Sequence, residues 1–100
     1  MEKRRPRYDL GSIKAAFITP ASLRITKTAL TTAEALDLTL DDVVTMIQGI
    51  RGAQFYKSMT SLADSRIWQD VYHVEFGGRV LYVKFTIDVE GYLVISLKEK

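Results

Sequence analysis

The stretch RIWQDVYHVEFGGRVLYVKFTIDVEGYLVISLKE, residues 66–99, contains three runs in which apolar and polar side chains alternate. A period of two is typical of β-strands that bury one face. Gly77-Gly78 joins the first two runs as a two-residue hairpin turn, and Val89-Glu90-Gly91 joins the next two as a three-residue loop with Gly91 in the left-handed conformation. The C-terminal part of the chain is therefore predicted to form an antiparallel sheet.

These turns also predict the register, because directly opposed residues of a hairpin point to the same face. Counting back from them pairs His73 with Tyr82, and Tyr82 with Lys98. One face then carries the predicted core: Trp68, Val74, Leu81, Val83, Phe85, Ile87, Leu93, Ile95 and Leu97. The other face is polar and carries Gln69, His73, Tyr82, Lys84, Thr86, Ser96 and Lys98.

The polar face has two interpretations. Antiparallel sheets commonly expose one face to water, so alternation alone does not indicate a function. This face, however, lacks an alternating ladder of Lys and Glu, and instead gathers Gln69, His73, Tyr82 and Lys98 in one row or beside it. Such a mixture can bind a phosphodiester.

Upstream of the sheet, apolar residues recur at helical spacing. Helices are expected in residues 9–18, which Pro20 ends, in residues 26–38, and in residues 40–50 after the N-cap Thr39. The segment LRIT, residues 23–26, can form a short edge strand. We expect an α+β fold in which N-terminal helices pack on one face of a mostly antiparallel C-terminal sheet.

A lysine interrupts the strand-like stretch FYKSMT, residues 55–60. In a regular strand, Phe55, Lys57 and Met59 share one face, so Lys57 joins the polar face only if this strand adds to the same sheet in the right register. The alternative is a lysine that extends over the sheet edge to reach water. The sequence leaves this pairing open.

Composition limits the possible functions. The chain has 100 residues, of which 47% are hydrophobic and 26% charged, so one domain over residues 1–100 is expected. With no cysteine and one histidine it has no disulfide framework and no Cys/His zinc site, and we expect no metal and no cofactor. The N-terminus MEKRRPR leads into polar sequence, and no apolar run is long enough to span a membrane, which favours a cytoplasmic protein.

Three motifs carry a resemblance to a known family. FYKSMT, IWQDVY and SLKEK, with the opening MEKRRP, resemble the MqsR family of bacterial toxins, the mRNA interferases of type II toxin–antitoxin systems, over nearly the whole chain. The resemblance implies a RelE-like toxin fold and ribosome-independent cleavage of mRNA at GC-containing sites of the GCU type. It also implies a cognate zinc-binding antitoxin, MqsA, and implies that this antitoxin, rather than the toxin, binds DNA.

The resemblance also implies a set of site residues. The family's catalytic residues fall on Lys57, Gln69, Tyr82 and Lys98. Its RNA contacts fall on Tyr56, Met59 and His73. At the position of His73 the resemblance leads us to expect an arginine, so this chain departs from the family there. A largely neutral imidazole is a weaker phosphate partner than a guanidinium. Lys84, on the polar face of the predicted sheet, completes the expected RNA-binding set.

The chemistry of metal-free RNA cleavage suits these residue types. The 2′-hydroxyl is the nucleophile, so the site needs a base, an acid for the leaving 5′-oxygen and positive charge on the phosphorane. We expect Lys57 to act as base or acid, assisted by a nearby Lys98 that stabilises the phosphorane. Tyr82 is the expected proton donor or orienting group, and Gln69 the positioning group.

Two other functions remain open from the sequence. An exposed sheet face with aromatic and basic residues is also found in modules that bind RNA or protein without cutting it. Direct DNA binding is disfavoured, because the helix predicted from Leu40 to Ile50 carries Asp41 and Asp42 where a recognition helix would read bases.

Overall fold

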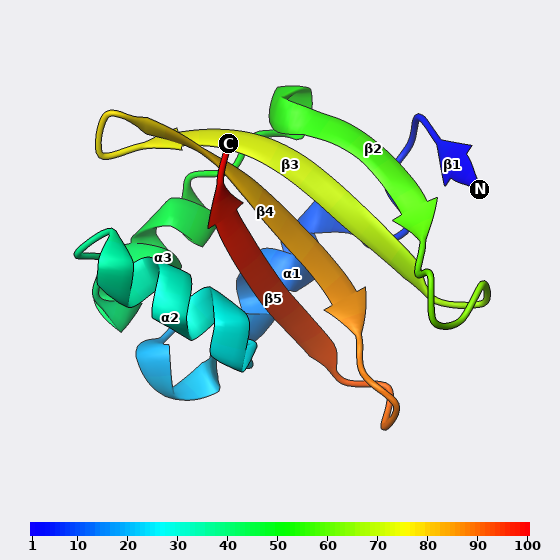
Figure 1. The fold of residues 1–100 in the computed structure, drawn as a ribbon, viewed down its shortest axis with the longest axis horizontal. Coiled ribbons are helices and arrows are strands. Elements are labelled where there is room, and N and C mark those ends of the chain that lie inside the picture. The colour runs from blue at the N-terminus through cyan, green and yellow to red at the C-terminus, as the bar shows by residue number, and fades with distance from the viewer.

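The computed structural model describes residues 1–100 as one layer of helices on one five-stranded sheet. The strands are antiparallel and lie in chain order, with the helices gathered on one side (Figure 1). The elements are β1 (Glu2–Lys3), α1 (Leu10–Ala16), the 3-10 helix η1 (Pro20–Ser22), α2 (Lys27–Ala35), α3 (Leu40–Gln48), the 3-10 helix η2 (Gly52–Gln54), β2 (Phe55–Thr60), β3 (Trp68–Phe76), β4 (Arg79–Ile87) and β5 (Leu93–Glu99). The predicted α+β class is confirmed.

Each α-helix begins at a polar cap. The side chains of Asp9, Thr26 and Thr39 accept hydrogen bonds from backbone N–H groups of the first turns of α1, α2 and α3. Helices of seven to nine residues are marginal in isolation, so packing against the sheet must supply most of their stability. The segment LRIT, residues 23–26, forms no edge strand and makes only one parallel bridge, between Ile25 and Ile95. Its last residue, Thr26, already serves as the N-cap of α2.

The register predicted from the two turns is confirmed. His73 lies opposite Tyr82, and Tyr82 opposite Lys98. Gly77, Gly78 and Gly91 have φ values of 60°, 79° and 85°, which an L-residue rarely adopts. The predicted core residues Val74, Leu81, Val83, Phe85, Ile95 and Leu97 are buried, whereas Trp68, Ile87 and Leu93 are only partly covered.

The core face of β3 holds two further buried residues, Asp70 and Tyr72, that its alternation places beside Val74. Burial, with the charges of Asp70 and Asp9 adding to it, raises the pKa of Tyr72 to about 12. Tyr72 therefore keeps its proton in the core and is not available to the opposite face, where Tyr82 on β4 lies.

Asp70 holds the N-terminal segment against the sheet. Its two carboxylate oxygens accept hydrogen bonds from the backbone N–H groups of Arg7, at 3.0 Å, and Tyr8, at 2.8 Å. The Tyr8 hydroxyl donates to the Trp68 carbonyl, and β1 pairs with β2 through Glu2 and Met59. A charged residue in the core is thus satisfied by backbone donors, as buried carboxylates require.

A β-bulge determines which face the FYKSMT residues occupy. β2 pairs with β3, but the register shifts between Phe55, opposite the core residue Tyr72, and Lys57, opposite Val71. The prediction that Phe55 shares a face with Lys57 and Met59 is therefore wrong. The extra residue at the bulge, Tyr56, lets Phe55 pack on the core while Lys57 reaches the polar face.

No helix of the structure has the length and apolar character needed to cross a bilayer.

Candidate active site on the open face of the sheet

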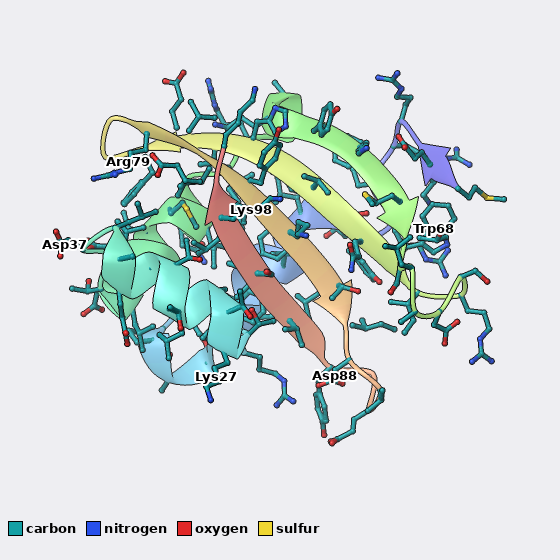
Figure 2. All side chains as sticks on the ribbon, in the orientation of Figure 1. Lys27, Asp37, Trp68, Arg79, Asp88 and Lys98 are labelled. Atoms are coloured by element: carbon teal, nitrogen blue, oxygen red, sulfur yellow. The ribbon has the colours of Figure 1, made fainter.

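The sheet surface turned away from the helices, here called the open face, arranges its side chains in rows across the strands. One row runs from Lys57 on β2 through Val71 and Lys84 to Ser96 on β5. The next row contains His73, Tyr82 and Lys98. Figure 2 shows Lys98 on the C-terminal part of β5, away from Lys27 on α2.

A cavity of about 300 Å³, here called the lysine cavity, opens between these rows. Three of the four predicted catalytic residues, Lys57, Tyr82 and Lys98, line it. The predicted RNA contacts Tyr56, Met59 and Lys84 complete the lining, together with Val71. Because these residues come from β2, β3, β4 and β5, the cavity requires four of the five strands of the sheet.

Two predicted site residues lie outside the lysine cavity. Gln69 is on the open face, opposite Met59, one row away from Lys57. His73 is next to Tyr82 in the register but lines a different cavity. Conversely, Val71, which is 4% exposed, contributes to the lining although sequence reasoning did not select it. The alternation along β3 could have identified it, since Val71 lies midway between Gln69 and His73.

The two lysines that are predicted to be catalytic enter the cavity from opposite sides. β3 and β4 separate their strands, which places the two backbones about 14 Å apart. Lys57 Nζ lies 3.4 Å from a carboxylate oxygen of Glu2, and Lys98 Nζ lies 5.7 Å from the centre of the Tyr82 ring. The ammonium of Lys57 is thus paired with the carboxylate of Glu2.

Sequence reasoning did not select Glu2 as a site residue. It lies on β1, whose pairing with β2 carries the carboxylate to Lys57. Only the opening MEKRRP of the family resemblance includes it. A contact between residues 2 and 57 depends on tertiary structure, which local sequence patterns do not contain.

His73 is enclosed by two tyrosines. Its ring stacks on Tyr56 with the ring centres 4.2 Å apart, and meets the Tyr82 ring edge-on at 4.8 Å. Burial lowers the pKa of His73 from its usual 6.5, and the charge of Lys100 lowers it further. Its Nε2 atom is buried without a hydrogen-bond partner. A neutral ring so placed orients the two tyrosines and is poorly suited to pair with phosphate.

The chain is similar to a known protein family and to a named protein of that family. A family described as "Motility quorum-sensing regulator, toxin of MqsA" matches residues 5–99. The chain is also 38% identical, over 100 residues and the full length of both proteins, to a protein of Escherichia coli (strain K12) named mRNA interferase toxin MqsR. The matched region includes every residue that lines the lysine cavity.

Proposed function

This chain belongs to the MqsR toxin family, and from that membership we propose that it is an endoribonuclease toxin that cleaves messenger RNA on its open face. The observation that carries the proposal is the lysine cavity, in which Lys57, Tyr82 and Lys98 converge on one site. Transesterification of RNA needs a base, an acid and positive charge on the phosphorane, and two lysines with a phenol can supply these functions.

In the proposed reaction, the 2′-oxygen of the RNA attacks the adjacent phosphorus while the bond from phosphorus to the 5′-oxygen breaks. A base takes the proton from the 2′-hydroxyl, and an acid gives a proton to the departing 5′-oxygen. The products are a 2′,3′-cyclic phosphate and a 5′-hydroxyl. The reaction consumes no water and requires no metal ion, so we propose that cleavage is metal-independent.

The residues of the open face divide these tasks. Lys98, which is exposed beside Tyr82, is assigned to stabilise the phosphorane, and Tyr82 to donate or orient a proton. Lys57 acts from the opposite wall, as the acid while its ion pair with Glu2 keeps it an ammonium and as the base after it has lost that proton. Gln69, one row away, positions the RNA strand beside Met59.

The finer properties of the family form a further part of the proposal. We propose cleavage at GC-containing sites of the GCU type, without the ribosome, and neutralisation by a zinc-binding MqsA-like antitoxin. The support is the full-length similarity to the Escherichia coli protein and the description of the matched family as the toxin of MqsA. Direct DNA binding is assigned to the antitoxin.

Expression of wild type and Lys57→Ala, followed by mapping of new 5′ ends in cellular transcripts, tests this function. Wild type should arrest growth and produce recurrent cuts, and Lys57→Ala should do neither. Lys27→Ala, which removes an exposed lysine on α2, is the matched control and should behave as wild type. A folded wild-type protein that binds RNA and leaves it intact would support a non-catalytic binding module instead.

A further inference from the structure

A second cavity adjoins the lysine cavity on the open face. Its volume is about 720 Å³, within the range of pockets that hold small ligands. Tyr56 lines both cavities, so the two share one wall. The polar and aromatic lining of the second cavity is Arg51, Gln54, Tyr56, His73, Glu75 and Lys100. Arg51, Gln54, Glu75 and Lys100 take no part in the proposed cleavage reaction.

The charged side chains of this cavity have no partners within the chain. Arg51, Glu75 and Lys100 are exposed, and none of them takes part in the four ion pairs of the structure. Elsewhere on the surface, Arg24, Arg66 and Arg79 each pair with a carboxylate. Unpaired charges of both signs around one cavity are available to a ligand that carries both donors and acceptors.

One of the polar groups is fixed in place before any ligand arrives. The Gln54 side-chain oxygen accepts a hydrogen bond from the backbone N–H of Arg51 at 2.7 Å, which closes the short helix η2 on itself. The amide NH₂ of Gln54 therefore remains as a donor in a defined position. Groups held by their own structure lose little entropy on binding.

The aromatic groups connect this cavity with the catalytic residues. Tyr56 stacks on His73, and His73 contacts Tyr82, which lines the lysine cavity. Tyr56 is still 43% exposed, so its ring can contact a nucleobase. Stacking on aromatic side chains is the usual way in which proteins hold an unstacked base of single-stranded RNA.

From this arrangement we propose that the second cavity binds one unstacked nucleotide of the substrate RNA, next to the scissile phosphate. Tyr56 stacks on the base, and Arg51 and Lys100 contact phosphate or acceptor atoms. Glu75 accepts a hydrogen bond from the exocyclic amino group of the base, which uracil lacks. The inference rests on the proposed function and adds to it the site that selects one base of the cleavage sequence.

The test is cleavage of a transcript pool with randomised sequence in EDTA, with every new 5′ end sequenced. Wild type should disfavour uracil several-fold at one position close to the cut. Glu75→Gln should accept uracil there, because a carboxamide can also donate to a carbonyl oxygen, and should leave the other positions unchanged. Glu34→Gln, an exposed glutamate on α2, is the matched control and should keep the wild-type preference.

Arg51→Ala provides an independent variant on the same RNA. It should raise KM more than fivefold with little change in kcat, whereas Arg66→Ala, which removes an arginine from the loop between β2 and β3, should change neither. Wild-type base preference in Glu75→Gln together with wild-type KM in Arg51→Ala would overturn the inference while leaving the proposed function intact. If the two variants also bind the antitoxin more weakly, the cavity is a docking site for the antitoxin, and the inference is likewise overturned.

If wild type cuts no RNA, the proposed function fails, and binding then decides the inference. The probe is an end-labelled RNA decamer of mixed sequence. Arg51→Ala should bind it at least fivefold more weakly than Arg66→Ala does. Equal affinities of the two variants would overturn the inference.

Discussion

At the scale of single residues, the proposed chemistry of the open face centres on Tyr82. It lies opposite both His73 and Lys98 and lines the lysine cavity. The residues around it differ in how well the sequence predicts them. Its neighbours on β3 and β5 follow from counting back from two glycine turns, whereas the Glu2 that pairs with Lys57 is distant in sequence and was not predicted. The family resemblance, rather than any local pattern, selected Lys57 itself.

Replacing Tyr82 by Phe removes the hydroxyl group and keeps the ring beside His73. Cleavage of RNA at saturating substrate should fall by about 10²–10⁴-fold, the usual contribution of a proton-transferring group. The thermal unfolding midpoint should stay within a degree or two of wild type, because the ring packing is retained. Undiminished single-turnover cleavage by Tyr82→Phe would remove the hydroxyl from the mechanism.

The lowered pKa of His73 predicts a pH dependence of stability. As the pH falls below about 6.5, His73 becomes protonated in the unfolded chain, whereas in the folded chain it takes up a proton only at lower pH. The free energy of unfolding should therefore decrease as the pH falls below 6.5. His73→Gln should lose this component. Urea unfolding at pH 7.5 and pH 5.5 measures it.

The pKa values of Asp64 and Asp88 are lowered from 3.8, so these carboxylates gain protons only at a pH below the range of this comparison. They therefore do not contribute to the difference between pH 7.5 and pH 5.5. A difference between pH 7.5 and pH 5.5 that is the same in wild type and His73→Gln would contradict the assignment.

At the scale of elements, β2 is the part of the fold that sequence reasoning predicted least well. The strands β3, β4 and β5 follow from alternation and from turns that require positive φ, so their register could be predicted. The bulge at Tyr56 has no comparable local signal, because it arises where Phe55 packs edge-on against Tyr72 in the core. That packing decides that Lys57 lies on the open face.

The attachment of the N-terminal segment to β3 depends on Asp70. Asp70→Ala leaves the N–H groups of Arg7 and Tyr8 without their acceptor, and hydrogen bonds to a charged group contribute roughly 1.5–3 kcal/mol each. Urea titration should therefore show a loss of roughly 3 kcal/mol or more in the free energy of unfolding.

Glu34→Ala, which changes an exposed glutamate on α2, is the surface control for this measurement. It should have a much smaller effect than Asp70→Ala. Equal stability of Asp70→Ala and Glu34→Ala would show that the buried carboxylate does not anchor the segment.

At the scale of the whole molecule, the fold separates two tasks. The helices cover one face of the sheet and complete the core, and no helix covers the opposite face (Figure 1). The formal net charge is only +2, but Lys57, Lys84 and Lys98 all line one cavity on that face. Binding should therefore depend on these local charges rather than on total charge.

The salt dependence of RNA binding measures how many of these charges contact phosphate. For a single strand, each neutralised phosphate contributes about 0.7 to the slope of log K against log salt. An RNA made resistant by 2′-deoxy substitution at the cut should show a slope of about −2 from these three lysines, and a steeper slope if Arg51 and Lys100 also contact phosphate. Lys84→Ala should lower its magnitude by about 0.7, and Lys27→Ala should not. Equal slopes for all three proteins would place the RNA elsewhere.

The most direct test of the account is single-turnover cleavage, in EDTA, of one short RNA that contains a mapped cut site. A matched oligonucleotide with 2′-deoxyribose at that single position is tested beside it. The account predicts that wild type converts the RNA into a 2′,3′-cyclic phosphate and a 5′-hydroxyl, and that neither Lys57→Ala acting on this RNA nor wild type acting on the deoxy oligonucleotide gives product. Cleavage of the deoxy oligonucleotide at that position, or cleavage only after a divalent metal is added, would contradict it.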